Sequence, residues 1–388
     1  MRLTSEILVI LLTLCACTSH VKKEAYEAPW GDESGESDEL IMLTIYGPET
    51  YYEYHGRDMG TNYMLCEQLA EHLGKSVRID VCKDTADMIQ RLSADEGDVI
   101  AVPMSKKYQK GFTVVANNWV VNEKSGELAD KIRSWYNPKM LAEVKQRQQY
   151  QLSVASVTRR VFPVMLSAGK GQISQYDAYF RKYAPMALVD WVLLASQCYQ
   201  ESCFDTKAHS WAGACGLMQI MPATADHLGL PREQLFQPEP NIAAAARYMR
   251  ELQMAFQDIN NPKERLHFAL AAYNGGTNHV RDAMALAGKY GGVAQRWADV
   301  RRYILLLQEP RYYNDPVVKS GYMRGTETAS YVDQIMQRHE QYRRALATGT
   351  KVVSAVKTPQ SSAGSDGAIS PIEATPHRAT KKNKWRKE

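Results

Sequence analysis

The residues best suited to chemistry lie between Ala195 and Gly276. Glu201 follows the apolar helical segment Trp191–Ala195, and apolar surroundings disfavour the charged form of a carboxylic acid, so its pKa should be raised. A carboxyl group that stays protonated near neutral pH can donate a proton to a glycosidic oxygen, as a general acid does. Taken alone, a Glu-Ser pair at a helix end is more often structural, so the accompanying residues decide the interpretation.

Two further groups of residues accompany the glutamate. A turn at Gly216–Gln219 can approach a sugar closely, and the amide of Gln219 can bind hydroxyl or acetamido groups. Tyr273 is placed to hydrogen-bond Glu201, and Asn274-Gly275-Gly276 predicts a tight helix exit. Each feature alone has an ordinary interpretation as a core methionine, a capping asparagine or turn glycines. Their order and spacing together indicate a glycan-cleaving site.

These motifs closely resemble those of the soluble lytic transglycosylase domain, which is related in fold to goose-type lysozyme. The resemblance covers roughly Ile173 to Gln337, and Glu201-Ser202 matches the catalytic motif. The other matching motifs are Ser210 with Ala212–Gln219, Asn241-Ile242 with Tyr248, Ala272–Gly275, and Glu327-Thr328 with Tyr331-Val332. Ala245 departs from the family, which usually has glycine there, and we expect slightly tighter helix packing without loss of activity.

The resemblance implies a mechanism with one catalytic carboxyl group, Glu201. It would protonate the oxygen between N-acetylmuramic acid (MurNAc) and N-acetylglucosamine (GlcNAc), then deprotonate the C6 hydroxyl to give a 1,6-anhydro end. Most glycosidases use two carboxylates, and no second one is assigned here. The residues implied to bind or orient the glycan strands of peptidoglycan are Ser202, Ser210, Met218, Gln219, Tyr248, Tyr273, Asn274, Glu327 and Tyr331. A lysozyme-type muramidase and a non-catalytic peptidoglycan-binding lipoprotein are the alternatives.

The N-terminus predicts export and lipidation. Arg2 precedes the apolar run Ile7–Leu12, and small residues lead to Cys17, as in a secretory signal. This ending resembles a bacterial lipobox, which implies cleavage before Cys17 and a lipid anchor on its thiol; a plain signal peptide is the alternative. We therefore expect a signal peptide over residues 1–16, a flexible tether over 17–39, and a body in the periplasm of the cell envelope, held at the outer membrane.

Residues 40–136 predict an α/β lobe with a parallel sheet, because strand-like and helix-like segments alternate. The expected strands are 41–46, 77–81, 97–102 and 119–121, and the expected helices are 63–73, 84–92 and 127–135. The order resembles the first lobe of a periplasmic solute-binding protein, without room for the second lobe. The lobe is either half of a ligand-binding unit, or it is a structural spacer or a docking module for an envelope protein.

The remaining chain predicts a helical connector over residues 137–172, a mostly α, lysozyme-like catalytic domain over 173–347 and a disordered basic tail over 348–388. In the catalytic domain, Ser174 predicts the N-cap of a helix over 175–183, and Pro185 predicts the start of the helix that leads to Glu201. Further helices are expected at 223–228, 241–256, 262–272, 278–287 and 296–307. The fold class is thus α+β with several domains, and the combination resembles the membrane-bound lytic murein transglycosylase F family with a shortened solute-binding domain.

Composition sets looser bounds. A chain of 388 residues predicts two or three domains, and a net charge of +4 does not indicate a nucleic-acid partner. Export allows disulfides, and five of the seven cysteines remain after Cys15 and Cys17. Cys66 with Cys82 and Cys203 with Cys215 are plausible pairs, and the odd number leaves at least one cysteine unpaired or paired between chains. No cysteine or histidine spacing is typical of a metal site, so neither a metal nor a cofactor is expected.

Overall fold

The computed structural model describes residues 38–350 and 352. The expected signal peptide, Cys17, the tether up to residue 37 and nearly all of the basic tail lie outside these residues. The chain divides into two units, Met1–Asp38 and Glu39–Glu388, and all described helices and strands lie in the second. None of the described helices combines the length and apolarity that crossing a bilayer requires.

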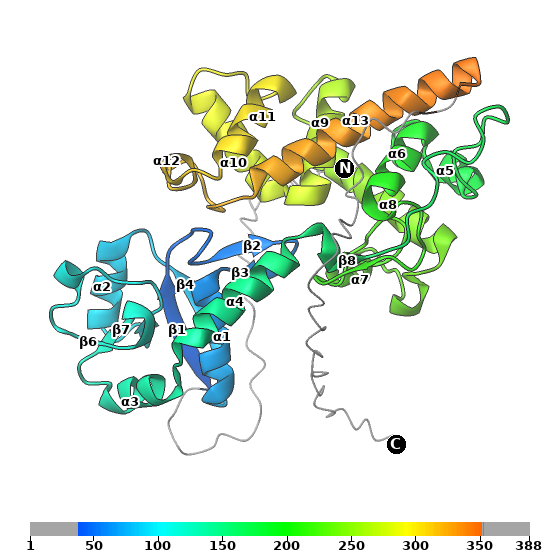
Figure 1. Ribbon diagram of the computed structural model, residues 1–388. Helices are drawn as coiled ribbons and strands as arrows, with labels where there is room; N and C mark the ends of the chain where they lie inside the picture. The colour runs from blue at the N-terminus through cyan, green and yellow to red at the C-terminus, as the bar shows by residue number, and fades with distance from the viewer. Residues whose placement is uncertain (1–37, 351, 353–388) are drawn as a thin grey trace, which may run out of the picture. The chain divides into compact units, whose positions relative to one another are not determined.

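The N-terminal part holds a five-stranded sheet in the order β4-β1-β5-β7-β6 (Figure 1). Its strands are β1 (Glu39–Thr44), β4 (Ser76–Val81), β5 (Val99–Ile100), β6 (Phe112–Val114) and β7 (Val120–Asn122). β1 pairs in parallel with β4 and β5, but β7 pairs antiparallel with β5 and β6. The prediction of a parallel sheet is therefore wrong at the β7-β6 edge. The connection from β6 to β7 is too short for the crossover that parallel strands need.

Helices cover both faces of this sheet. On one face lie α1 (Thr61–His72), α3 (Gly126–Trp135) and α4 (Pro138–Gln151), and on the other lies α2 (Thr85–Ser93). Met42 and Val99 belong to the core on the α1 side, whereas Leu43 and Ile100 belong to the core on the α2 side. Successive side chains of a strand point to opposite faces, so these short apolar strands are buried on both. Short 3₁₀ helices complete this part: η1 (Lys106–Tyr108), η2 (Ala116–Asn118) and η3 (Val154–Ser156).

A β-hairpin that the sequence did not predict leaves this α/β lobe. It consists of β2 (Tyr52–Tyr54) and β3 (Arg57–Met59), which pair antiparallel. The two turn residues His55 and Gly56 have φ values of 49° and 66°, as a two-residue hairpin turn requires. Tyr52 packs edge to face on Tyr322, with ring centroids 5.0 Å apart, so the hairpin contacts the helical domain. Below, "the hairpin" means residues 52–59.

The C-terminal part is almost entirely helical, so the expected α+β class is confirmed. Its helices are α5 (Asp177–Tyr183), α6 (Trp191–Ser202), α7 (Pro222–His227), α8 (Pro238–Ala255), α9 (Pro262–Gly275), α10 (Thr277–Lys289), α11 (Trp297–Leu306), α12 (Pro310–Tyr313) and α13 (Gly325–Thr348), with the 3₁₀ helix η4 (Arg232–Gln234). One large apolar core joins α6, α8, α9, α10, α11 and α13. The connector contacts this domain through its strand β8 (Val157–Thr158), which pairs with β9 (His209–Ser210) of the domain.

Two expected helix starts are wrong. Pro185 does not open the helix that carries the glutamate, because Leu188 has a φ of 56° and interrupts it. The helix α6 begins at Trp191, after an Asp190 cap that accepts hydrogen bonds from two backbone N–H groups at 2.9 and 3.1 Å. Ser174 does not cap α5, which begins at Asp177; its hydroxyl instead accepts the backbone N–H of Tyr176 in the preceding turn.

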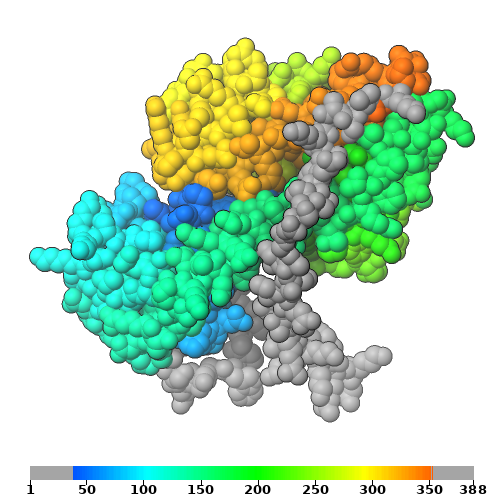
Figure 2. Space-filling model, in the orientation of Figure 1, coloured from blue at the N-terminus to red at the C-terminus, as the bar shows by residue number. Residues whose placement is uncertain are grey.

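The longest helix, α13, lies against α6, α9 and α11 (Figure 1), and its outer side forms part of the surface in Figure 2. Its first residue, Gly325, lies so close to α11 that a Cβ atom would overlap the carbonyl group of Ile304. The start of α13 therefore packs directly on the backbone of α11, and only glycine allows this close approach.

We predict that Gly325→Ala destabilises the protein by roughly 3 kcal/mol, because overpacking against backbone cannot be relieved by a side-chain movement. Gly288→Ala is the matched control, since nothing lies within 4 Å of its Cβ position and alanine favours helix by roughly 0.5–1 kcal/mol. The free energies of unfolding from urea denaturation measure both effects. Equal stability of the two variants would contradict the packing described here.

Candidate active site

Glu201 lies in the last turn of α6, beside a cleft of ≈ 520 Å³. The helix ends at Ser202 because Cys203 and Phe204 adopt φ values of 51° and 64° and turn the chain away. The glutamate is half-buried and lines the cleft. The sequence correctly placed this carboxyl group at the end of an apolar helix.

Burial raises the pKa of Glu201 to about 7. A hydrogen bond opposes part of this increase in the pKa. The Tyr331 hydroxyl donates to Oε1 of Glu201 at 2.5 Å and stabilises the ionised form. The electrostatic effects of His55 and Arg159 on Glu201 act in the same direction, and the negative charge of Glu327 opposes them. A carboxyl group with this pKa can both donate and accept a proton near neutral pH.

Tyr273 does not make the expected hydrogen bond to Glu201. Its hydroxyl donates to the backbone carbonyl of Met218 at 2.8 Å, and Tyr331 occupies the position at the glutamate. The ring of Tyr273 packs against Tyr248, with centroids 5.3 Å apart. Tyr273 thus holds the glycine-rich turn against α9, while α13 supplies the partner of the carboxyl group.

The glycine-rich turn is held by Asn241 of α8. Its side chain accepts the backbone N–H of Met218 at 2.8 Å and donates to the carbonyls of Cys215 and Leu235. A Cβ at Gly216, where φ is 79°, would overlap the Leu235 carbonyl, so this position requires glycine. The sequence motifs include Asn241, but its role in fixing the turn becomes visible only in the structure.

The residues expected to bind glycan occupy different positions. Gln219 lines the cleft, but its amide NH₂ group donates to the carbonyls of Ala208 and Gly216 within the loop. Met218 is fully buried and lines neither cavity described here. The hydroxyl of Ser202 is buried and donates to a carbonyl of its own helix. The residues that do line the cavities are Ser210, Gln219, Tyr248, Tyr273, Asn274, Glu327 and Tyr331.

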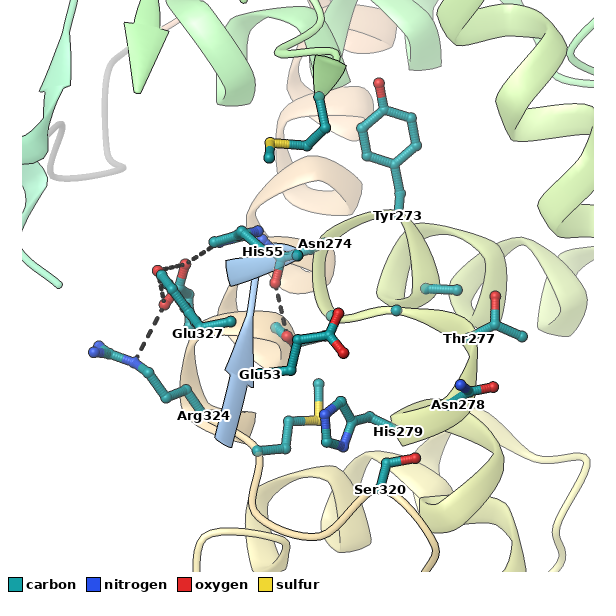
Figure 3. A pocket seen from close by; sticks show the side chains of 18 of the residues that line it. Glu53, His55, Tyr273, Asn274, Thr277, Asn278, His279, Ser320, Arg324 and Glu327 are labelled. Atoms are coloured by element: carbon teal, nitrogen blue, oxygen red, sulfur yellow. Dashed lines mark hydrogen bonds and ion pairs between the residues drawn. The ribbon is translucent and has the colours of Figure 1, made fainter. Parts of the chain in front are cut away.

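A second cavity, of ≈ 790 Å³, adjoins the cleft (Figure 3). The two share the wall residues Tyr54, His55, Gln219, Met221, Tyr273, Asn274, Arg324 and Glu327. In Figure 3 the hairpin enters this cavity, with Glu53 inside it and His55 beside Glu327. The hairpin therefore forms part of the wall between the two cavities.

Glu327 is the carboxylate that the hairpin contacts. Tyr54 donates to both of its oxygens at 2.9 Å, and His55 and Arg324 lie 3.3 and 3.5 Å away. Burial works to raise the pKa of Glu327, but these partners hold it below its ordinary value. Glu327 and Glu201 therefore differ in protonation at neutral pH. The sequence signal for the hairpin was weak, a two-residue His-Gly turn between aromatic residues.

Arg159, from the connector, contacts the end of the helix that carries the glutamate. Its Nη1 donates to the backbone carbonyl of Glu201 at 2.9 Å and to that of Gln200 at 3.4 Å. Carbonyl groups at a helix C-terminus lack partners within the helix, and a cation favours that end. No sequence pattern indicates this contact beyond the basic composition of the connector.

The five cysteines of residues 38–350 are all free, so the two suggested disulfides are not formed. Cys66 belongs to the core on one face of the sheet and Cys82 to the core on the other. Cys203 is buried, while the Cys215 thiol donates to the carbonyl of Gly213. Within the described residues, no group of three or more histidine, cysteine, aspartate or glutamate side chains is arranged to hold a metal ion.

Part of the helical domain matches a known family. Residues 178–294 match the family described as "Transglycosylase SLT domain". This segment of the chain is therefore similar to the SLT family, as its sequence motifs predict.

Two curated proteins that the chain resembles share a name. It is 40% identical over 169 residues to "Membrane-bound lytic murein transglycosylase F" of Desulfosudis oleivorans, covering 44% of this chain but only 36% of that protein. It is 26% identical over 407 residues to the protein of that name from Enterobacter sp., covering 76% and 78%. The crystal structure of the 70 kDa soluble lytic transglycosylase SLT70 from Escherichia coli aligns with a TM-score of 0.33 and 22% identity, covering 54% and 28%.

We predict that Tyr331→Phe raises the pKa of Glu201 above its value of about 7, because it removes a hydrogen bond to the ionised form. Tyr273→Phe should move this pKa less, since the Tyr273 hydroxyl is bonded to a backbone carbonyl. Carboxyl ¹³C chemical shifts followed against pH, with Glu201→Gln for assignment, measure both. A larger increase in Tyr273→Phe than in Tyr331→Phe would show that the hydrogen bonds are assigned wrongly.

Proposed function

We propose that the protein is a peptidoglycan lytic transglycosylase that cleaves the β-1,4 bond between MurNAc and GlcNAc without water. The observation that carries this proposal is the half-buried carboxyl group of Glu201, which has a pKa of about 7 and lines a cleft. The SLT domain and the names of the similar proteins support the same reaction.

Glu201 is suited to both proton transfers of this reaction. Protonated, it donates to the glycosidic oxygen, while the acetamido group of the substrate stabilises the cation that develops. Ionised, it keeps the hydrogen bond from Tyr331 and takes the proton of the C6 hydroxyl, which closes the 1,6-anhydro ring. A pKa near the working pH keeps both transfers accessible.

Glu327 is not proposed as a second catalytic carboxylate. Glycosidases that use two carboxylates keep one as a nucleophile or as a base for water. Glu327 is engaged by Tyr54, His55 and Arg324, so its oxygens already accept several partners. This favours the one-carboxylate reaction over a lysozyme-type muramidase.

We further propose that the cavity walls bind the glycan. Ser210, Gln219 and Tyr248 line them and present polar atoms. Asn274 accepts a hydrogen bond from Thr328 at 2.7 Å through its Oδ1, which leaves its NH₂ group to donate to a sugar. Met218 and Ser202 would act from beneath the cleft, by supporting the turn and the end of α6.

The cellular setting is part of the proposal. The protein would be exported, lipidated at Cys17 and held at the outer membrane with its body in the periplasm, where peptidoglycan lies. Residues 40–136 would form a lobe able to dock an envelope protein, 137–172 a connector and 173–347 the catalytic domain. The words "membrane-bound" in the names of the similar proteins support the anchor.

We predict that Glu201→Gln abolishes sugar release from purified peptidoglycan, because the amide cannot donate or accept the catalytic proton. The wild-type protein without its signal should release fragments that end in 1,6-anhydroMurNAc, as mass spectrometry of the products shows. Glu251→Gln, an exposed residue of α8, is the matched control and should remain active. Reducing ends would mean a muramidase, and no release by the wild type would leave a peptidoglycan-binding lipoprotein.

A further inference from the structure

A buried glutamine lies one helical turn before Glu201. Gln197 and Glu201 are four positions apart on α6, so they share one face of the helix, and both contact Tyr331 of α13. Gln197 is 0% exposed and lines neither of the two cavities. It therefore does not touch a glycan in the cleft, and any effect that it has on the reaction must pass through a neighbouring residue.

That neighbour is Tyr331, whose hydroxyl lies between the two side chains. Nε2 of Gln197 donates to the Tyr331 oxygen at 3.2 Å, and the Tyr331 hydroxyl donates to Oε1 of Glu201 at 2.5 Å. The three residues form a chain of hydrogen bonds in which every donor points towards Glu201. A hydroxyl that accepts one hydrogen bond becomes a stronger donor in the next, so the two bonds strengthen each other.

One atom of this glutamine has no partner. Its Oε1 is buried and accepts no hydrogen bond from the described residues. A buried polar atom without a partner destabilises a fold, and an apolar side chain of similar length would fill the same space without this effect. The feature that only the glutamine supplies here is the N–H group directed at Tyr331.

This N–H group determines where the single proton of the Tyr331 hydroxyl points. Because Nε2 of Gln197 already donates to the oxygen, that proton is directed to Oε1 of Glu201. The carbonyl oxygen of a neutral carboxyl group is its better acceptor, so the acid proton is left to Oε2. Oε2 makes no hydrogen bond within the described residues and is not among their buried unpartnered atoms, so it is open to the cleft that Glu201 lines.

We propose that Gln197 is a positioning residue, which donates to Tyr331 and thereby places the acid proton of Glu201 on the oxygen that faces the substrate. The inference rests on the proposed function, because it concerns the proton that Glu201 delivers. In the first step, Oε2 gives its proton to the glycosidic oxygen as the bond from that oxygen to C1 breaks. In the second, Oε2 takes the proton of the C6 hydroxyl as O6 bonds to C1. The protons of Tyr331 and Gln197 stay in place.

The competing arrangement explains why a donor is needed. Without the N–H group of Gln197, the Tyr331 hydroxyl can turn away and accept a hydrogen bond from Glu201. The acid proton would then lie on Oε1, directed at Tyr331 and away from the cleft. Only neutral Glu201 can adopt this arrangement, and neutral Glu201 is the form that starts the proposed reaction. Gln197 disfavours the arrangement as long as its amide donates.

The first test replaces Gln197 with methionine, an apolar side chain of similar length and volume. We expect kcat on soluble GlcNAc-MurNAc oligosaccharides to fall roughly tenfold, the effect of one net hydrogen bond, while KM changes less than about twofold. Stability against urea should equal or exceed that of the wild type, because the unpartnered Oε1 is removed. Gln253→Met is the matched control: Nε2 of Gln253 donates to the carbonyl of Ala187, so stability should fall while kcat is unchanged.

A double-mutant comparison separates positioning from a merely structural role. Gln197 acts only through the Tyr331 hydroxyl, so Gln197→Met should have no further effect on kcat in a Tyr331→Phe background. A general disturbance of α6 would instead lower kcat by the same factor in both backgrounds.

The carboxyl ¹³C chemical shift of Glu201 gives a measurement that does not depend on turnover. Gln197→Met should raise the pKa of Glu201, by less than Tyr331→Phe does, because it weakens the hydrogen bond that stabilises the ionised form. His55, Arg159 and Glu327, the charged groups that also act on Glu201, are the same in both proteins. A lowered pKa of Glu201 would mean that Gln197 accepts from Tyr331 rather than donating to it, and would overturn the inference.

Unchanged kcat in Gln197→Met, or equal losses in the two backgrounds, would also overturn the inference while leaving the proposed function intact. Gln197→Leu tests the same points if the methionine side chain does not pack. If the wild type released no anhydro product, the proposed function itself would fail, and the positioning role would be rejected with it.

Discussion

The site depends on one unfavourable arrangement, a carboxyl group placed half-buried at the C-terminal end of a buried helix. Desolvation and the negative end of the helix dipole both disfavour its ionised form. Because the pKa of Glu201 rises from 4.5 to about 7 on folding, the folded state loses stability as pH rises through this range. The loss is on the order of 3 kcal/mol once the group is ionised. The residue proposed to perform the reaction is thus one whose ionised form destabilises the folded state.

Three segments distant in sequence stabilise the ionised form of Glu201 and so reduce this loss of stability. Tyr331 of α13 donates a hydrogen bond to the carboxyl group, Arg159 of the connector donates to the end of its helix, and His55 of the hairpin acts on Glu201 electrostatically in the same direction. All three lie outside residues 178–294, which match the SLT family. The matched segment therefore supplies the acid, and the rest of the chain sets its protonation and shapes the surrounding cleft.

Local patterns in the sequence predicted the parts of the fold that local forces determine. Helices α5 to α11, the first three sheet strands and the position of Glu201 at a helix end follow from periodicity, proline and glycine, whereas α12 and α13 were not predicted. The partner of Glu201 could not be predicted in this way. Tyr273 and Tyr331 are both tyrosines of family motifs, and only the packing of α13 on α6 decides which one reaches the carboxyl group.

The remaining errors have the same origin. The antiparallel edge of the sheet depends on how a short connection folds back, and the hairpin is stabilised by contacts such as that of Tyr54 with Glu327, which lies 273 residues away. Cys66 and Cys82 cannot pair because they lie on opposite faces of the sheet. Such long-range contacts are fixed by the whole fold, and a single sequence carries little signal for them.

The central claim is that burial keeps Glu201 protonated near neutral pH. Its most direct test is the pH dependence of kcat/KM for the wild-type protein on purified peptidoglycan, since this profile reports the ionisation of the free enzyme. The account predicts an alkaline limb with an apparent pKa of about 7, because activity falls as the general acid loses its proton. A limb near the ordinary value of 4.5, or activity that stays constant from pH 6 to beyond about 9, would contradict it.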